Sequence, residues 1–210
     1  MKLTKLLERL DYKVVAGSDN IEITELVNDS RKVVPGSVFV CISGAVSDGH
    51  QYVKDVAEKG AAAVIVEKDV EVPEGLTVIK VEDTRYALAL MSAAYFGYPA
   101  EKLKTIGITG TKGKTTTTYM VKAILEEVGH KVGLIGTIEA IIGDKTIPSN
   151  NTTPESYTIQ KYFAQMVEAG CDCVVMEVSS QGLMLHRTAG TMFDIGIFTN
   201  LGEDHIGPNE

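Results

Sequence analysis

The segment GITGTKGKTTTT has the residue types and spacing to hold the phosphates of a nucleotide. Gly110 and Gly113 let the backbone curl so that several N–H groups converge on one anion, and the helix that follows adds positive potential at its first turn. Lys114 supplies a mobile cation, and the hydroxyl of Thr115 or Thr116 can ligate Mg²⁺. A Gly-Lys-Thr turn can also be an ordinary helix start, but this combination favours a nucleoside triphosphate site.

A second candidate group lies at the ends of two later apolar segments. The run CVVME places Glu177 at the carboxyl end of a buried strand, where an acidic residue beside a phosphate loop commonly organises Mg²⁺. The alternative is a solvated strand-end glutamate. The next run, FDIGIFTN, leads to His205, and the residues alone leave a metal ligand and a surface histidine equally open.

These residues need a strand, a turn and a helix to position them, and the second half of the chain has that pattern. Strands are expected at residues 103–109, 131–136, 138–142, 145–147, 171–178 and 194–199, with helices at residues 115–128 and 155–169. Strands that alternate with helices predict an α/β fold with a mainly parallel sheet and helices on both faces. Ligands of such sheets bind beyond the carboxyl ends of the strands.

The first half has the same alternation on a smaller scale. Compact apolar runs predict strands at residues 37–42, 62–66 and 77–81, and helical spacing of apolar residues predicts helices at residues 51–59 and 84–96. The sequence Gly97-Tyr98-Pro99 then breaks the helical pattern. We therefore expect two α/β domains, residues 1–97 and residues 98–210.

Composition excludes several classes of protein. The chain of 210 residues is 44% hydrophobic and carries a net charge of −8 with no basic stripe, which argues against a nucleic-acid partner. No segment approaches ~18 consecutive apolar residues, so no membrane span is expected. Glu8 and Arg9 lie where a signal peptide needs an apolar core, and the N-terminus is instead expected to form a short amphipathic helix.

The three cysteines do not form a disulfide framework. Cys171 and Cys173 flank Asp172 inside an apolar strand, with no CxxC pattern and no nearby histidine to suggest a metal site. We interpret them as buried thiols of a protein in the reducing cytoplasm.

Several motifs occur together in a fixed order along nearly the whole chain. They are DSR at residues 29–31, PGSVFV, DGH at residues 48–50, TGTKGKTTT at residues 109–117, NTTP at residues 151–154, EVSSQGL at residues 177–183 and FTNL..DH at residues 198–205. In this order they resemble the Mur ligases, and most closely the tripeptide synthetases of that family, which attach a diamino acid to UDP-MurNAc-L-Ala-D-Glu.

The resemblance implies roles for individual residues. ATP would be bound by Gly110, Thr111, Lys112, Gly113, Lys114, Thr115 and Thr116. Mg²⁺ would be held by Thr115, Glu177 and His205, and Lys114, Glu177 and His205 would form the catalytic group. The uridine part of the substrate would contact Asn28, Ser30, Ala45, Val46 and Ser47, and the muramoyl-peptide part would contact Asn151, Thr152, Thr153, Ser179 and Arg187.

The residues themselves also allow simpler structural roles. Thr153 could cap a helix with Pro154 at its first position, Arg187 could be a surface arginine, and Ser30 could be a turn residue.

The chemistry implied by the resemblance is an ATP-dependent amide ligation. ATP phosphorylates a substrate carboxylate, and the amine of the diamino acid then attacks the acyl phosphate. The partners would be small molecules only, in a monomeric cytoplasmic enzyme. The resemblance further implies that the chain stops short of the rest of the central domain and of the C-terminal domain, so that residues 1–210 alone would be inactive.

Three other hypotheses fit parts of the sequence. A ligase similar to folylpolyglutamate or cyanophycin synthetases would share the phosphate loop but not the upstream DSR and PGSVFV segments. A non-catalytic module could bind UDP-muramoyl ligands and ATP without reacting them. A general P-loop NTPase switch would release phosphate without an acceptor.

Overall fold

The computed structural model describes residues 1–44 and 47–203, and the chain divides into two compact units, Met1–Tyr95 and Phe96–Glu210. The division falls at the end of helix α3 (Thr84–Tyr95), close to Gly97, where the sequence analysis placed the boundary. Gly97 and Tyr98 both have positive φ angles, of 70° and 54°, which a continuing helix cannot have. The chain therefore leaves the helix at this point.

Unit 1 is a small α/β domain. Its sheet has the order β1-β5-β4-β3-β2, and all pairs are parallel except that of β1 with β5. The strands are β1 Lys13–Ala16, β2 Leu26–Val27, β3 Val38–Val40, β4 Ala63–Val66 and β5 Thr77–Lys80. The helices are α1 Leu3–Leu6, α2 Val53–Glu58 and α3, with short 3-10 helices η1 Ser30–Lys32 and η2 Gly49–Tyr52.

Unit 2 is the larger α/β domain and carries the phosphate loop. Its sheet has the order β11-β6-β10-β7-β8-β9. The elements are η3 Pro99–Lys102, β6 Lys104–Thr109, α4 Lys114–Glu127, β7 Val132–Ile135, β8 Glu139–Ile142, β9 Lys145–Pro148, α5 Ser156–Glu168, β10 Cys173–Glu177, α6 Ser180–Met184 and β11 Ile195–Phe198. Strands β11, β6, β10 and β7 are parallel, and β8 and β9 add an antiparallel hairpin.

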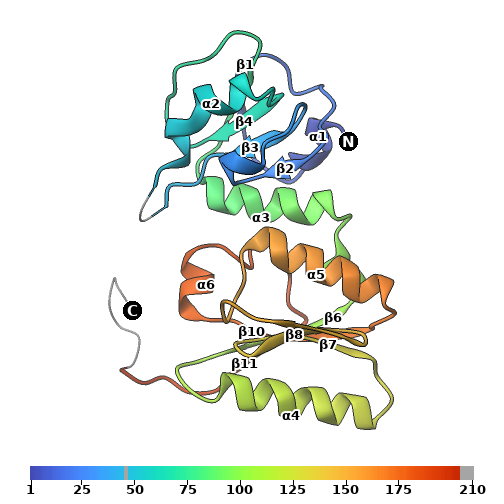
Figure 1. Cartoon of the computed structure of the whole chain (residues 1–210). Coiled ribbons are helices and arrows are strands. Elements are labelled where there is room, and N and C mark those ends of the chain that lie inside the picture. The colour runs from blue at the N-terminus through green and yellow to red at the C-terminus, as the bar shows by residue number, and fades with distance from the viewer. Residues whose placement is uncertain (45–46, 204–210) are drawn as a thin grey trace. The chain divides into compact units, whose positions relative to one another are not determined.

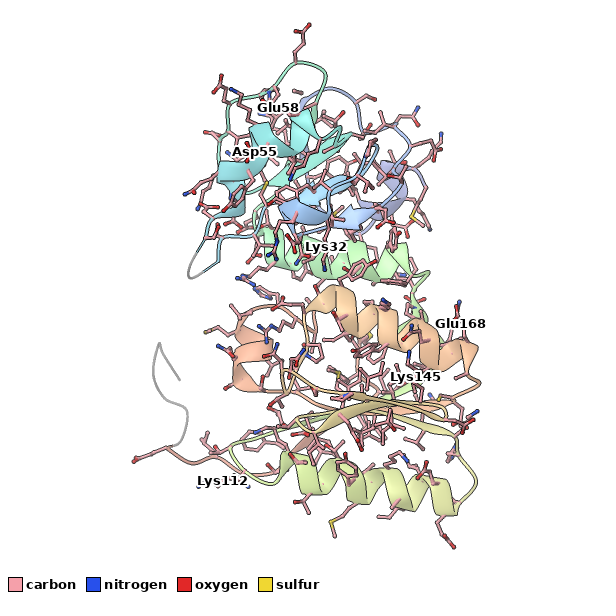
Figure 2. All side chains as sticks on the ribbon, in the orientation of Figure 1. Lys32, Asp55, Glu58, Lys112, Lys145 and Glu168 are labelled. Carbon is pink, nitrogen blue, oxygen red and sulfur yellow. The ribbon has the colours of Figure 1, made fainter. Side chains whose placement is uncertain are left out.

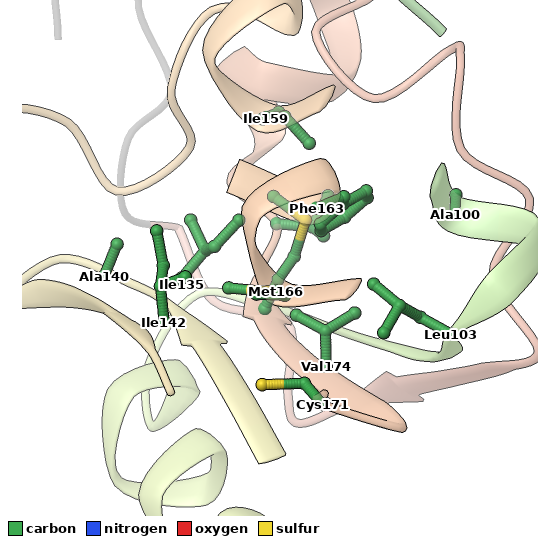
Figure 3. Close-up of a cluster of buried hydrophobic side chains, with 12 residues drawn as sticks. Ala100, Leu103, Ile135, Ala140, Ile142, Ile159, Phe163, Met166, Cys171 and Val174 are labelled. Carbon is green, nitrogen blue, oxygen red and sulfur yellow. The ribbon is translucent and has the colours of Figure 1, made fainter. Parts of the chain in front are cut away.

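Helices cover both faces of the unit 2 sheet, as Figure 1 shows for α4 on one side and α5 on the other. On the α5 side, Ile159, Phe163 and Met166 are fully buried and point from one stripe of the helix toward sheet residues such as Val174 (Figure 3). Each such side chain contributes ~2 kcal/mol through burial. On the α4 side, Val121 and Leu125 pack against a separate cluster of strand residues. The predicted mainly parallel α/β fold is confirmed.

Local predictions differ from the structure where short-range signals were weak. The expected N-terminal helix is one turn, Leu3–Leu6, and the expected helix at residues 51–59 begins as the 3-10 turn Gly49–Tyr52. The sequence analysis missed strands Lys13–Ala16 and Leu26–Val27. Each of these strands contains too few apolar residues to show the two-residue repeat of a β-strand. Among the described residues, no helix is both long and apolar enough to cross a membrane.

Candidate functional site

The phosphate loop joins the carboxyl end of β6 to the first turn of α4. Gly113 is the N-cap of α4, has a φ of 83° and offers no side chain to the free N–H groups of the 14-residue helix. Gly110 has a φ of 132°, and a Cβ there would lie 2.9 Å from the carbonyl oxygen of Asn200. Only glycine fits both positions, and the helix start is left open to an anion.

Lys114 lies folded across this loop. Its Nζ donates hydrogen bonds to the carbonyl oxygens of Gly110, at 2.7 Å, and Thr111, at 3.1 Å. Both acceptors are neutral, so a phosphate oxygen is a stronger partner for the ammonium group. The lysine can therefore exchange these contacts for an anion without leaving a buried charge unpaired.

Two residues after β11 hold the loop in shape. The Asn200 side chain accepts a hydrogen bond from the Lys112 N–H at 3.1 Å and donates one to the Lys112 carbonyl at 2.9 Å. The Thr199 hydroxyl donates to the same carbonyl at 2.7 Å, and the Asn200 carbonyl accepts from the Thr111 N–H at 3.0 Å. Lys112 itself is exposed and lies beside the start of α4 (Figure 2).

Glu177 is a buried carboxylate at the carboxyl end of β10, with 1% of its surface exposed. It accepts hydrogen bonds from the Thr115 hydroxyl at 2.9 Å, the Thr137 N–H at 2.8 Å and the Thr137 hydroxyl at 3.1 Å. The absence of a side chain at Gly136 leaves room for the carboxylate, since a Cβ there would collide with Oε1. Within residues 1–44 and 47–203, no lysine or arginine pairs with it.

This donor set fits Mg²⁺. Glu177 supplies a carboxylate and Thr115 and Thr137 supply hydroxyls, and all of these are the hard oxygen ligands that Mg²⁺ prefers. A buried carboxylate balanced only by neutral donors also favours a nearby cation. His205, the other predicted ligand, lies outside the described residues.

Thr153 organises the wall of the site that faces the phosphate loop. Its buried hydroxyl donates to the Glu177 carbonyl at 3.0 Å and accepts from the Ser179 N–H at 2.9 Å. It does not cap α5, which begins at Ser156 with Glu155 as N-cap. Ser179 in turn accepts a hydrogen bond from the Gly182 N–H and caps the short helix α6. Both residues thus have structural roles, whatever else they contact.

Arg187 is anchored to the same wall. Its Nη1 donates to the Thr153 carbonyl at 2.9 Å, and its Nη2 lies 2.7 Å from a Glu155 carboxylate oxygen. The side chain is only 13% exposed, and its Nε is a buried donor without a partner among the described atoms. The guanidinium is therefore fixed in place by protein contacts and keeps hydrogen-bonding capacity.

A single cleft of about 680 Å³ lies between these two walls. Its lining includes the predicted residues Gly110, Thr111, Lys114, Asn151, Thr152, Thr153, Ser179 and Arg187, together with Thr137 and Asn200. The hydroxyls of Thr137 and Thr152 lie 3.0 Å apart and connect the Glu177 end of the cleft to the NTTP segment. Residues predicted for two different ligands in unit 2 therefore share one cavity.

Burial shapes the electrostatics near Glu177. The pKa of Tyr119 is raised to about 12. The main cause is burial of its hydroxyl, and the second is the hydrogen bond of 2.8 Å that this hydroxyl donates to Glu139. Tyr119 therefore stays a neutral donor at any ordinary pH. The negative charge near the end of β10 comes from Glu177 and Glu139 rather than from a phenolate.

In unit 1, the structure describes three of the predicted uridine-contacting residues, Asn28, Ser30 and Ser47. Asn28 follows β2 and Ser47 lies in the segment after β3, and the two strands are parallel, so both residues are at their carboxyl ends. Ser30 opens η1, and its carbonyl accepts a hydrogen bond from Lys59 at 2.8 Å. Ala45 and Val46 lie outside the described residues.

Sequence reasoning missed the side chains that fix this edge. His50 lies between an Asp48 carboxylate oxygen, 2.6 Å from its Nδ1, and the Glu67 N–H, which donates to its Nε2 at 3.1 Å. The Glu67 carboxylate accepts from the Ser43 hydroxyl and from the N–H and hydroxyl of Thr84. Burial alone would raise the pKa of Glu67, but the hydrogen bonds outweigh it and leave the pKa below its usual value.

Thr137, Thr199 and Asn200 were also missed as site residues. Thr137 comes directly after the glycine that ends strand segment 131–136, and β7 neighbours β10 in the sheet. The rule that ligands bind beyond strand carboxyl ends would have pointed to it. Thr199 and Asn200 lie in the FTNL motif and follow strand β11, so the same rule applies to them. Their bonding partner, a loop some 90 residues earlier, could not be read from that motif.

Comparison with known families agrees with this geometry. Residues 22–98 match the family described as "Mur ligase family, catalytic domain", and residues 108–208 match "Mur ligase middle domain". The chain belongs to the Mur ligase family. The first matched segment ends at residue 98, just past Gly97, and the second begins at residue 108.

Similar proteins are known from several bacteria. The UDP-N-acetylmuramoyl-L-alanyl-D-glutamate–2,6-diaminopimelate ligase of Clostridium perfringens is 50% identical over 206 residues, which are 98% of this chain and 43% of that protein. The ligase of the same name from Bacillus licheniformis is 48% identical over 211 residues, covering 100% of this chain and 43% of that protein. The chain thus spans less than half the length of these Mur ligases.

Solved structures share the fold. A structure of a UDP-N-acetylmuramoyl-L-alanyl-D-glutamate–2,6-diaminopimelate ligase superimposes with a TM-score of 0.81 at 22% identity and covers 100% of this chain and 42% of that one. The MurF ligase of Thermotoga maritima, solved in complex with ADP, gives a TM-score of 0.55 at 24% identity over 86% of this chain and 38% of that one. Both comparisons show a Mur ligase fold.

Proposed function

We propose that this chain forms the first part of an ATP-dependent amide ligase that attaches a diamino acid to UDP-MurNAc-L-Ala-D-Glu. The observation that carries the proposal is the shared cleft, in which an open phosphate loop faces a polar wall. The buried Glu177 carboxylate lies beneath this cleft's lining residue Thr137, from which it accepts a hydrogen bond, and it accepts another from Thr115 at the start of α4. Relatives about half identical to the chain are named as ligases of this kind, with diaminopimelate as the acceptor. Because this reaction consumes ATP, we propose that the protein acts in the cytoplasm.

The phosphate loop suits the nucleotide. The β- and γ-phosphates of ATP would accept hydrogen bonds from the N–H groups at the start of α4, and Lys114 would turn from the Gly110 and Thr111 carbonyls to the phosphate oxygens. Thr115, Thr116 and the backbone of Lys112 and Gly113 would complete this binding loop. Thr115 and Glu177 would hold Mg²⁺, which would supply positive charge to the transferred phosphoryl group.

The opposite wall suits the acyl substrate. Arg187 and the hydroxyls of Thr152 and Ser179 would hold the anionic muramoyl-peptide with its terminal carboxylate toward the phosphates. A carboxylate oxygen attacks the γ-phosphorus, the bond to ADP breaks, and an acyl phosphate forms. The amine of the diamino acid then attacks the acyl carbon, phosphate leaves, the nitrogen loses a proton, and an amide remains.

Residues of unit 1 would bind the nucleotide end of the same substrate. Asn28, Ser30, Ala45, Val46 and Ser47 would make the uridine contacts. The Glu67 carboxylate accepts a hydrogen bond from the Ser43 hydroxyl, and the Glu67 N–H donates one to His50. The number of subunits in the complete enzyme, which we propose to be one, does not affect this arrangement.

Binding measurements on the 210-residue chain test the proposal. Calorimetry should detect UDP-MurNAc-L-Ala-D-Glu and MgATP, and should detect neither folate polyglutamates nor poly-aspartate. Ser30→Ala and Arg187→Ala should each weaken binding of the muramoyl-dipeptide about tenfold, ~1.4 kcal/mol, while leaving ATP affinity unchanged. Ser18→Ala, in a turn of unit 1, is the matched control. If both variants bind the muramoyl-dipeptide as tightly as the parent chain does, its site lies elsewhere.

Activity of the complete enzyme distinguishes ligation from the other hypotheses. Continued ADP formation over many turnovers should require both the muramoyl-dipeptide and a diamino acid. ADP release without an acceptor would favour a switch NTPase, and binding without turnover in the complete protein would favour a non-catalytic module. We expect residues 1–210 alone to form no amide product by mass spectrometry.

A further inference from the structure

A second cluster of potential metal ligands lies in unit 2, at the edge of the sheet where the parallel strands begin. His130 lies between α4 and β7, and Asp172 and Cys173 lie at the start of β10. A ring nitrogen of His130, an Asp172 carboxylate oxygen and the Cys173 Sγ all lie within 4.8 Å of one another. The sequence analysis saw no histidine near these cysteines, because His130 is brought there only by the pairing of β7 with β10.

The backbone holds these residues in place. The His130 N–H donates to the Leu125 carbonyl at 3.0 Å, which closes the end of α4 after Gly129. The Asp172 N–H donates to the Lys131 carbonyl at 3.0 Å, and the Lys131 N–H donates to an Asp172 carboxylate oxygen at 3.0 Å. The ligand atoms therefore come from two segments that are already joined, and ordering them costs little further conformational entropy.

The exposure of the three side chains suits an ion that enters from solvent. The side chains of His130 and Asp172 are 44% and 54% exposed, and their Nδ1 and carboxylate oxygen lie 2.8 Å apart. Cys173 lies beneath them, with 3% of its surface exposed, in the core cluster on the α4 side of the sheet. One side of the cluster thus faces water, which can supply a further ligand.

We propose that His130, Asp172 and Cys173 form a binding site for Zn²⁺ or a similar borderline-soft divalent cation, with water in the fourth position. Imidazole nitrogen, thiolate sulfur and carboxylate oxygen are the ligand types of tetrahedral zinc sites, whereas Mg²⁺ avoids sulfur. The ion replaces the proton of the Cys173 thiol, which is released to water, and exchanges the His130–Asp172 hydrogen bond for two coordinate bonds.

The site is distinct from the proposed catalytic cleft. Its residues join the end of α4 to the start of β10, whereas the cleft lies at the start of α4 and the end of β10. The 14 residues of α4 separate the two ends by about 20 Å. A metal bound here would fasten a helix end to the sheet, so its expected effect is on stability.

A cobalt titration tests the site directly. The untagged 210-residue chain, metal-free and reduced, is titrated with Co²⁺, which gives a near-ultraviolet charge-transfer band only with a thiolate ligand. We expect one equivalent of Co²⁺ to produce the band, and Zn²⁺ to abolish it by displacement. Cys173→Ser should remove the band, and His130→Ala and Asp172→Asn should each weaken binding at least tenfold.

Cys171→Ser is the matched control. Cys171 is buried in the α5-side cluster, so its thiol is not part of the proposed site and the band should be unchanged. Because His130 is exposed, the His130→Ala variant should fold normally. It therefore tests the site even if Cys173→Ser, a change in the core, fails to fold. Zinc should also raise the melting temperature of the chain, and His130→Ala should lose that increase. Absence of a thiolate band at one equivalent, or its persistence in Cys173→Ser, would overturn the proposal.

Discussion

The Thr115 hydroxyl lies 2.9 Å from the Glu177 carboxylate and ties the first turn of α4 to the end of β10. Thr137 donates to the same carboxylate, and its hydroxyl lies 3.0 Å from that of Thr152 on the opposite wall. A line of hydroxyl groups with one buried carboxylate at its centre therefore connects the phosphate loop to the NTTP segment. Because only neutral groups donate to this buried carboxylate, loss of any one of them leaves the charge less well hydrogen-bonded and destabilises the whole arrangement.

Lys114→Ala should abolish useful ATP binding. The ammonium group is the mobile cation of the loop, and its partners in the described part of the chain are the Gly110 and Thr111 carbonyls. We expect ATP affinity of the chain to fall by about 100-fold or more. Lys122→Ala, which removes a surface pair with Glu126 on the same helix, should bind ATP normally. The measurement is calorimetry with MgATP, and comparable affinities of the Lys114 variant and the parent would refute the assignment.

Thr137→Val should weaken the connection between the two walls of the cleft. The substitution keeps the backbone N–H that donates to Glu177 but removes the hydroxyl shared by Glu177 and Thr152. We expect kcat/KM of the complete enzyme to fall about tenfold, ~1.4 kcal/mol. Thr137→Ser retains the hydroxyl and should retain most activity, and Thr146→Val on exposed β9 controls for the β-branched replacement. Equal losses in the valine and serine variants would mean that the hydroxyl is not what matters.

Asn200→Ala should loosen the phosphate loop without unfolding the sheet. Its side chain makes two hydrogen bonds to the backbone of Lys112, and both are lost in the variant. Hydrogen exchange should become faster at the amide of Lys112, and ATP affinity should fall about tenfold. Asn20→Ala, on the surface of unit 1, should change neither quantity. If the hydrogen-exchange rate at Lys112 is unchanged, the contacts of Thr199 and of the backbone are sufficient to hold the phosphate loop in shape.

Asp48 should make the stability of unit 1 depend on pH. Lys68, 2.7 Å away, and then His50 hold the pKa of Asp48 well below its usual value. Because the pKa is lowered on folding, the stabilisation is complete above the unfolded pKa of about 3.9 and is lost as the pH falls through the folded value. Asp48→Asn should therefore cost ~1 kcal/mol at neutral pH, after allowance for solvent screening.

The measurement for Asp48 is urea unfolding followed by hydrogen exchange in strands β3 to β5, at neutral and acidic pH. The free energies of unfolding of parent and variant should begin to converge below about pH 4 and should meet only as the pH falls through the lowered pKa of Asp48. Asp11→Asn, at an exposed carboxylate of the same unit, should not differ from the parent at either pH. A difference for Asp48→Asn that stays constant with pH would contradict the ion-pair account.

The motifs specified the local chemistry, because the groups they need are adjacent in the chain. Gly110, Gly113 and Lys114 predict a phosphate loop since a turn and a helix start involve only consecutive residues. The buried run that ends at Glu177 predicts a strand with a carboxylate at its end for the same reason. The order of strands and helices likewise predicted the α/β class, which requires only the period of the apolar residues.

The tertiary structure decided which distant groups meet. The side chain of Asn200 closes on Lys112, Thr137 donates to Glu177, Glu67 joins Ser43 to Thr84, and His130 reaches Cys173. These contacts depend on strand order and register, which are set by packing of the whole sheet. A residue's neighbours along the chain carry no trace of them. By itself, therefore, the sequence determined the chemical groups of the site, and the sheet determined their partners.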